Sequence, residues 1–136
     1  MNELHITKIQ AAAASLYERG DIDSIDDFFS PHYCVHLTEQ VLNGGNKIIG
    51  IAIKQIKKAF PELTLEVEIL MVCEDRVAWQ RTLKGQQKGA FKGFPASNRE
   101  IVWREIVVSR FENGLITEEW VSTDLAEQLL ASRKKS

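Results

Sequence analysis

The end of the chain combines acidic and aromatic side chains in a pattern suited to acid–base chemistry. Five residues share one parity along the last expected strand, and so one sheet face if that strand is regular: Ile116, Glu118, Trp120, Ser122 and Asp124. A carboxylate beside an indole in a dry pocket has its charged form disfavoured, which raises its pKa. Asp124 is therefore our first candidate for a base that removes a proton from a carbon flanked by carbonyl groups. Alternatively, Asp124 caps the final helix, because it stands just before Leu125.

Glu118 and Gln87 are further polar candidates, and each has a structural alternative. Glu118 can act as a second acid or orient a substrate, or it can pair with Arg81 or Arg104 on a neighbouring strand. Gln87 can donate an amide hydrogen bond to a substrate carbonyl oxygen and so stabilise an enolate. It is equally well explained as a glutamine of a surface loop.

An earlier segment raises the question of a metal site. His32, Cys34 and His36 alternate along one expected strand and so face one way, and both residue types are zinc ligands in other proteins. No carboxylate or further cysteine stands at a suggestive spacing elsewhere, so we predict that no metal binds. A histidine satisfied within the core is then the default interpretation of His36.

The three tryptophans lie on three separate expected strands, and core packing is the first explanation for all of them. They are Trp79, Trp103 and Trp120, of which we place Trp120 at a cavity wall beside the acidic candidate. Neither Cys34 nor Cys73 has an activating neighbour in the sequence, and no Gly-x-Ser-x-Gly elbow occurs. A nucleophilic triad is therefore not indicated.

The elements that position these residues begin with helices. Apolar residues recur at mostly three- and four-residue intervals over 3–19, and a second, shorter helix is expected to run through Phe29. A third helix is expected from Asn46, a candidate cap, to about Phe60. The last helix is expected over 123–132.

Strands fill the rest of the chain. The expected strands cover 32–38, 63–73, 77–84, 100–111 and 115–121. Asn113-Gly114 is a strong signal for a two-residue hairpin. Helices followed by hairpin-linked strands predict an α+β fold, with N-terminal helices packed on a highly curved, mainly antiparallel β-sheet. We expect this sheet to form a cone that encloses a pocket, and residues 1–136 to form a single domain.

Composition argues against several classes of function. The 136-residue chain has a net charge of -2, which gives no electrostatic reason to expect nucleic acid or an anionic membrane as partner. No stretch approaches the ~20 apolar residues of a membrane-spanning helix, and the start lacks the features of a signal peptide. Cys34 and Cys73 lie in apolar segments and are expected to be reduced core thiols. We therefore predict a cytoplasmic location.

Several short motifs follow one another in an order typical of one family. They are Phe60-Pro61-Glu62-Leu63, Asp75-Arg76-Val77, Arg81-Thr82-Leu83-Lys84-Gly85, Gly89-Ala90-Phe91-Lys92-Gly93-Phe94-Pro95 with Arg99, Arg110-Phe111-Glu112-Asn113-Gly114-Leu115-Ile116, and finally Glu118, Trp120 and Asp124. Through these motifs the chain resembles the SnoaL-like polyketide (ester) cyclases of the nuclear transport factor 2-like superfamily. The resemblance covers nearly the whole chain.

The resemblance implies a conical α+β domain that binds a small apolar ligand, with no metal and no cofactor, and that often forms dimers or tetramers. In the family an acidic residue at the position of Asp124 acts as general acid and base in an aldol ring closure. Gln87 stands where the family has a histidine, and His36 aligns with a position near the pocket. The residues expected to contact substrate are His36, Trp120, Glu118, Trp79 and Arg81.

Three functions remain open at this point. The first is a cyclase or isomerase that acts on a small apolar carbonyl compound by aldol- or enolisation-type chemistry. The second is a non-catalytic small-molecule-binding domain of the same fold, which the replacement of the histidine by Gln87 favours. The third is a dimerising module that uses an exposed sheet face. The fold alone does not choose among them, because function depends on the site.

Overall fold

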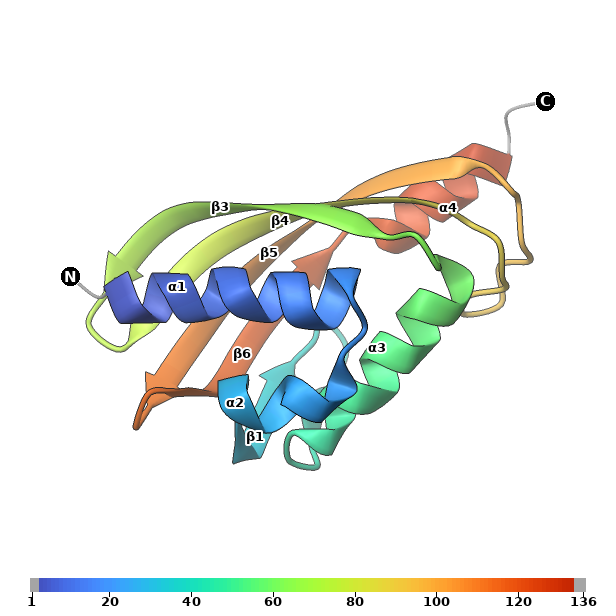
Figure 1. Ribbon diagram of the computed structural model, residues 1–136. Coiled ribbons are helices and arrows are strands. Elements are labelled where there is room, and N and C mark those ends of the chain that lie inside the picture. Colours follow the sequence, from blue (N-terminus) through green and yellow to red (C-terminus); the bar gives the residue numbers. More distant parts are fainter. Residues whose placement is uncertain (1–2, 134–136) are drawn as a thin grey trace.

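The computed structural model describes residues 3–133, and its helices come mostly before its strands, as the sequence predicts (Figure 1). The α-helices are α1 (Glu3–Ala12), α2 (Ile25–Phe28), α3 (Lys47–Ala59) and α4 (Leu125–Arg133). A π-helical segment, η1 (Ala13–Glu18), continues α1, and a 3-10 turn, η2 (Ile22–Ser24), leads into α2. The predicted helix over 3–19 is therefore present, but its last part is wound more widely.

A six-stranded sheet forms the second layer of the fold. Its strands are β1 (Phe29–His36), β2 (Val41–Asn43), β3 (Thr64–Cys73), β4 (Arg76–Gln86), β5 (Glu100–Glu112) and β6 (Leu115–Thr123). They lie in the order β2-β1-β6-β5-β4-β3, in which β1 and β6 are parallel and the other neighbours are antiparallel. The predicted α+β class and mainly antiparallel sheet are confirmed.

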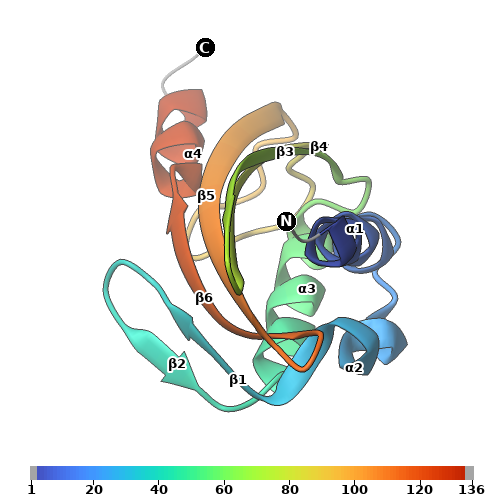
Figure 2. The same cartoon turned by 90° about the vertical axis from the view of Figure 1, so that its left-hand side faces the viewer.

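The sheet is strongly curved, and α1, α2 and α3 lie on its concave side (Figure 2). One cluster of buried side chains on this side includes Ile53 of α3 and Val107 of β5. A second cluster, toward α4, includes Phe60 and Trp103. Each large apolar side chain buried in this way contributes about 1.5–3 kcal/mol to stability. Packed side chains therefore occupy much of the interior of the cone.

Two boundaries near the N-terminus differ from the prediction. The second helix ends at Phe28, and Phe29 already begins β1, where its side chain is 5% exposed. Asn46 precedes α3, but its side chain does not cap that helix. Its amide nitrogen donates instead to the Asp26 carboxylate at 2.7 Å and to the Phe29 carbonyl at 3.0 Å. Asn46 therefore ties the start of α3 to the junction between α2 and β1.

A β-bulge in β6 changes which side chains share a face. The facing pairs shift by one position between Arg110 and Phe111 of β5, which leaves Thr117 of β6 as the extra residue. Beyond this bulge Glu119 is buried in the interior, whereas Trp120 borders a hollow on the outer face. The prediction of one shared face assumed a regular strand: it holds for Glu118, Trp120 and Ser122 on the outer face, but it is wrong for Ile116, which precedes the bulge and is buried in the core.

The two cysteines are free thiols with different surroundings. Cys34 is half-buried on β1, and Cys73 is exposed at the end of β3. The prediction of two core thiols is therefore wrong for Cys73, because this residue comes where β3 gives way to the turn. Within residues 3–133, no helix combines the length and the apolar character needed to cross a membrane.

Gly45 allows the tight turn between β2 and α3. Its φ is +74°, and a Cβ at this position would lie 2.5 Å from the Pro31 carbonyl oxygen. Glycine tolerates both the backbone conformation and the close approach, since it has no side chain.

We expect Gly45→Ala to lower the free energy of unfolding more than Gly93→Ala does. Gly93 has a φ of +85°, and a Cβ added there would meet no heavy atom within 4 Å, so Gly93→Ala carries only the conformational cost of about 1–2 kcal/mol. Gly45→Ala adds a collision with Pro31 to the same cost. Urea unfolding of both variants measures the difference, and equal losses would contradict the role of the Pro31 contact.

Candidate functional site

The interior of the cone contains a buried carboxylate, Glu119 of β6, which is 4% exposed. Its Oε1 accepts a hydrogen bond from the Tyr33 hydroxyl at 2.6 Å, and its Oε2 accepts one from the Ser109 hydroxyl at 2.5 Å. The Ser109 oxygen in turn accepts a hydrogen bond from the Trp79 indole nitrogen at 2.9 Å. These contacts join four strands and satisfy both carboxylate oxygens, as burial of a polar group requires.

A buried ion pair, Arg81 with Glu105, lies on the same face of the sheet. Arg81 Nε donates to Glu105 Oε1 at 2.7 Å, and the Trp103 indole nitrogen donates to Oε2 at 3.3 Å. The guanidinium also lies over the rings of Tyr17, at 4.7 Å, and Trp79, at 5.3 Å. Tyr17 belongs to η1, and π-helical turns are frequent at functional sites. We call the whole group the core polar cluster: Tyr17, Tyr33, Trp79, Arg81, Trp103, Glu105, Ser109 and Glu119.

Burial controls protonation in the core polar cluster. Desolvation raises the pKa of Glu119, and the charge of Arg81 and the hydrogen bonds that Glu119 accepts offset only part of this effect. Desolvation and the nearby Glu119 charge raise the pKa of Tyr33 well above its usual value. Burial by itself lowers the pKa of Arg81, but Tyr17 and two carboxylates raise it overall, so the guanidinium stays charged. A carboxyl group with a raised pKa beside a fixed cation is typical of acid–base sites.

Three other predicted residues gather on the outer face of the sheet. Glu118 Oε2 lies 2.6 Å from His36 Nε2, and the His36 ring stacks on Trp120 with a centroid distance of 4.8 Å and an angle of 4°. His36 and Trp120 border a shallow hollow of about 280 Å³, together with Ile106 and Val108 of β5. The predicted substrate contacts are therefore divided between two faces of one sheet.

Glu118 pairs with an arginine on a neighbouring strand, but the partner differs from the prediction. Arg110 Nε donates to Glu118 Oε1 at 2.9 Å, in place of Arg81 or Arg104. Burial by itself raises the pKa of Glu118, but the hydrogen bonds from His36 and Arg110 lower it overall. Adjacent carboxylates on β6 thus have pKa values shifted in opposite directions.

Asp124 lies at the junction of β6 and α4. Its Oδ1 accepts a hydrogen bond from the Arg104 backbone N–H at 2.8 Å, and its Oδ2 accepts one from the Gln128 side chain at 3.2 Å. These contacts hold Asp124 in a structural position, but neither donor is a backbone N–H of α4, so they are not the predicted helix cap. The Leu125 N–H at the start of α4 donates instead to the Thr123 hydroxyl at 3.2 Å. Among residues 3–133, those that border the two hollows described here do not include Asp124. Its acid–base role stays a prediction.

Gln87 is buried rather than placed on the surface of its loop, with 1% of its area exposed. The side-chain nitrogen lies within hydrogen-bond distance of the carbonyl oxygens of Gly89 at 3.2 Å, Phe94 at 3.3 Å and Pro95 at 3.2 Å. The surface-loop alternative is therefore wrong. In this conformation the amide braces its own loop, and a role toward a substrate carbonyl stays a prediction.

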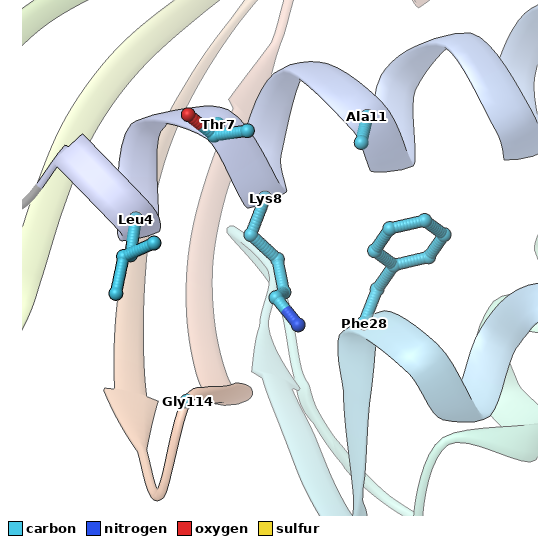
Figure 3. Close-up of a pocket in the computed structure, with 6 residues that line it drawn as sticks. All are labelled: Leu4, Thr7, Lys8, Ala11, Phe28 and Gly114. Carbon is cyan, nitrogen blue, oxygen red and sulfur yellow. The ribbon is translucent and has the colours of Figure 1, made fainter.

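An apolar hollow of about 410 Å³ opens between α1, α2 and the turn that follows β5 (Figure 3). Its lining residues are Leu4, Thr7, Lys8, Ala11, Phe28 and Gly114. Phe28 is followed by Phe29, whose ring contacts that of Tyr33 edge-to-face at 5.0 Å, and Tyr33 donates to Glu119. Through Phe28, the hollow borders the buried apolar cluster that contains Phe29 and Tyr33. Its volume is within the range of about 300–1,000 Å³ that ligand sites occupy.

The sequence predicts some members of the interior site and misses others. Trp79 and Arg81 share a face of the regular strand β4, and both belong to the core polar cluster. The sequence does not predict Glu119 as a site residue, because regular alternation places Glu118 on the face expected to line the pocket and Glu119 on the opposite face. The sequence does contain one sign of the irregularity. Three consecutive polar residues, Thr117-Glu118-Glu119, interrupt the alternation of apolar and polar residues in this strand.

The sequence matches one family model over most of its length. The model describes SnoaL-like polyketide cyclases and covers residues 7–131. No curated protein matches the sequence.

Solved structures share this fold over nearly the whole chain. A proposed SnoaL-like polyketide cyclase from Jannaschia sp. CCS1 has a TM-score of 0.85 at 20% identity, over 98% of this chain and 94% of that one. A proposed polyketide cyclase from Acidithiobacillus ferrooxidans has a TM-score of 0.85 at 19% identity, over 100% and 99%. AclR, a proposed hydroxylase from Streptomyces galilaeus, has a TM-score of 0.82 at 24% identity, over 97% of each chain. At these identities the similarity shows the fold alone.

The opposite pKa shifts of the two adjacent carboxylates predict opposite pH dependences of stability. Because the folded state raises the pKa of Glu119, its contribution is present below the unfolded value of about 4.3 and is lost as pH rises through the folded pKa. Because the folded state lowers the pKa of Glu118, its contribution is present above about 4.3 and is lost as pH falls through the folded pKa. Urea unfolding of Glu119→Gln, Glu118→Gln and the parent at a series of pH values measures both.

The parent should therefore lose stability relative to Glu119→Gln as pH rises, and gain stability relative to Glu118→Gln. Glu127→Gln, at an exposed position of α4, controls for the removal of one carboxylate from the surface. A parent that gains stability over Glu119→Gln with rising pH would show that the hydrogen bonds and Arg81 outweigh desolvation.

Proposed function

We propose that this chain, which belongs to the SnoaL-like polyketide cyclase family, is an acid–base enzyme that acts on a small apolar carbonyl compound. The family supplies the reaction class, which is aldol- or enolisation-type chemistry. The observation that carries the proposal is the buried Glu119 carboxylate, held by Tyr33 and Ser109 in the interior of the cone. Glu119 takes the acid–base role for which the sequence favours Asp124.

The proposed reaction begins with proton transfer to Glu119. The carboxylate removes a proton from a carbon next to a carbonyl group, and the electron pair moves onto the carbonyl oxygen to give an enolate. The positive charge of Arg81, fixed by Glu105 at 2.7 Å, stabilises the negative charge that develops. Return of the proton to another atom completes an isomerisation. Alternatively, attack of the enolate carbon on a second carbonyl closes a ring, and the alkoxide that results takes up the proton held by Glu119.

The substrate is proposed to enter through the apolar hollow between α1 and α2. Lys8 of α1 donates to the Asp27 carbonyl of α2 at 3.0 Å, and this exposed hydrogen bond is a weak link between the two helices. We propose that separation of the helices widens the hollow beyond Phe28 toward Phe29, whose ring contacts that of Tyr33. An apolar substrate suits this route because its lining is mostly hydrocarbon.

Asp124 is retained as a second proposed proton-transfer group, because the family places its acid–base residue at this position. To act, its carboxylate must leave the Arg104 N–H and the Gln128 amide. Gln87 is proposed to support the loop that it braces. The remaining predicted substrate contacts take no part in this reaction, because they lie across the sheet from Glu119: His36, Trp120 and Glu118.

The alternative function is a non-catalytic small-molecule-binding domain. The engaged side chains of Asp124 and Gln87 favour it, because neither is free to meet a substrate without rearrangement. A dimer or tetramer and a cytoplasmic location stay predictions.

The first test is a thermal-shift screen of polyketide-like and steroid-like carbonyl compounds, since a ligand that binds only the folded state raises the melting temperature. Binding should be abolished by Ala11→Trp, which fills the apolar hollow, and retained by Ala126→Trp, at an exposed position of α4. Equal binding by both variants would contradict the proposed entry route.

The second test measures exchange of a substrate C–H for deuterium in heavy water by NMR. We expect the parent to catalyse exchange for a bound compound and Glu119→Gln to be slower by roughly 100-fold or more. Glu127→Gln should match the parent. Loss of exchange in Asp124→Asn but not in Glu119→Gln would assign the base to Asp124. Binding without any catalysed exchange would establish the non-catalytic alternative.

A further inference from the structure

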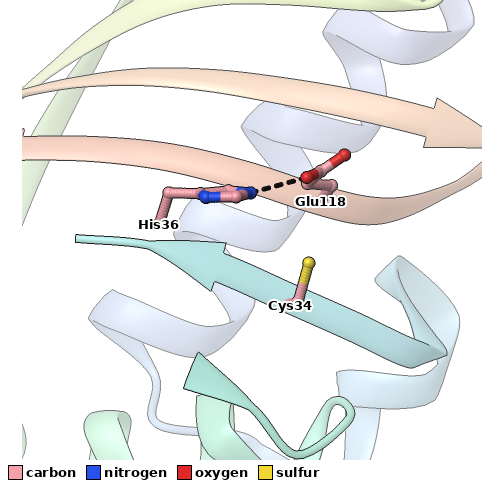
Figure 4. Close-up of side chains that lie close together, drawn as sticks. All are labelled: Cys34, His36 and Glu118. Atoms are coloured by element: carbon pink, nitrogen blue, oxygen red, sulfur yellow. Dashed lines mark hydrogen bonds and ion pairs between the residues drawn. The ribbon is translucent and has the colours of Figure 1, made fainter. Parts of the chain in front are cut away.

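Three side chains with metal-binding atoms converge on the outer face of the sheet. Cys34 and His36 come from β1, and Glu118 comes from β6 (Figure 4). The parallel pairing of these strands places Cys34 opposite Glu118 and His36 opposite Trp120. One ligand atom from each of the three residues lies within 4.8 Å of the other two. The carboxylate partner that the sequence alone does not reveal is therefore supplied by a strand far along the chain.

Neighbouring groups hold two of these side chains in place. Arg110 Nε donates to Glu118 Oε1 at 2.9 Å, which leaves Oε2 directed at His36 Nε2, 2.6 Å away. Trp120 stacks on the His36 ring at 4.8 Å, and the Arg76 guanidinium lies over the Trp120 ring, 4.9 Å from its centroid. Outer contacts of this kind orient metal ligands in proteins before the ion binds.

We propose that Cys34, His36 and Glu118 form a binding site for a zinc-like divalent cation. A thiolate, an imidazole and a carboxylate are the ligand types that Zn²⁺ prefers, whereas Mg²⁺ and Ca²⁺ prefer oxygen ligands alone. Three protein ligands leave the fourth tetrahedral position to water. The side chains of His36 and Glu118 are 30% and 19% exposed, so solvent and the ion have access from the outer face.

Binding of the metal ion requires only small movements of the ligand side chains, and the charges of the ion and its ligands balance. The ion replaces the proton between His36 Nε2 and Glu118 Oε2; this proton moves to Nδ1 or to solvent, so that a neutral imidazole protonated at Nδ1 binds through Nε2. The 2.6 Å contact opens because each metal–ligand bond is about 2.0–2.2 Å long. Cys34 binds as a thiolate and releases its proton to solvent. The charges of the thiolate and of Glu118 then cancel the two positive charges of the ion. Arg110 keeps its contact with Glu118 Oε1 and also lies 3.8 Å from Glu112.

The test is titration of the chelator-treated, full-length protein with Co²⁺ and Zn²⁺ in the presence of a phosphine reductant. We expect one Co²⁺ per chain, an absorption band from thiolate-to-cobalt charge transfer, displacement of this band by Zn²⁺, and a higher melting temperature. Absence of the band, or no saturable binding of Zn²⁺ by calorimetry, overturns the proposal. Neither readout depends on the enzymatic activity proposed above.

Matched variants assign the ligands. Cys34→Ser should remove the thiolate band, and His36→Gln should weaken Zn²⁺ binding at least tenfold. Cys73→Ser and His32→Gln should behave as the parent, because Cys73 lies at the end of β3 and His32 lies outside the three-residue cluster. Far-UV circular dichroism verifies that each variant is folded. A band that persists in Cys34→Ser, or equal Zn²⁺ affinity in His36→Gln and His32→Gln, overturns the assignment even where some metal binds.

Discussion

The interior of this protein depends on the burial of one carboxyl group. Glu119 is 4% exposed, and an ionised carboxylate removed from water costs several kcal/mol unless charge and hydrogen bonds compensate. Compensation comes from Tyr33 of β1 and Ser109 of β5, with the charge of Arg81 on β4 nearby. These residues meet only if β6 lies between β1 and β5, which is the strand order observed. The strand order therefore determines which groups surround Glu119, and these groups in turn determine its protonation.

Local patterns predict most of the fold, because helices and hairpins are encoded over short stretches. The alternation in β4 and the Asn113-Gly114 turn are such patterns, and Asn113 and Gly114 have φ values of 53° and 80°, as a tight hairpin requires. The parallel pairing of β1 with β6 leaves no such trace, because it joins distant segments. The bulge at Thr117 is also invisible to a period-two count, and it moves Glu119 rather than Glu118 into the interior.

The same limits apply to the candidate site: the sequence predicts the residues that lie on a regular strand, but not those whose positions depend on distant segments. Arg81 and Trp79 were found because β4 is regular over its whole length. Asp124 follows the last residue of β6, where the Arg104 backbone N–H and the Gln128 side chain hold its carboxylate. The adjacent residues Glu118 and Glu119 therefore lie in different surroundings. Glu118 lies beside a histidine, a thiol and an arginine on the outer face. Glu119 accepts hydrogen bonds from two hydroxyl groups in the core. A single strand thus supplies ionisable groups to both faces of the sheet.

The two edge strands of the sheet determine whether other chains can add to it at high protein concentration. One edge is β2, which has three residues, too few to act as a template for another chain. The other edge is β3, where the Glu18 carboxylate accepts a hydrogen bond from the Leu65 N–H at 3.3 Å, and Glu66 and Glu68 are exposed. A shift in pairing between Ile69 and Met71 further bends this edge. Neither border offers a long, flat and uncharged ladder, so the sheet resists growth into fibrils by strand addition.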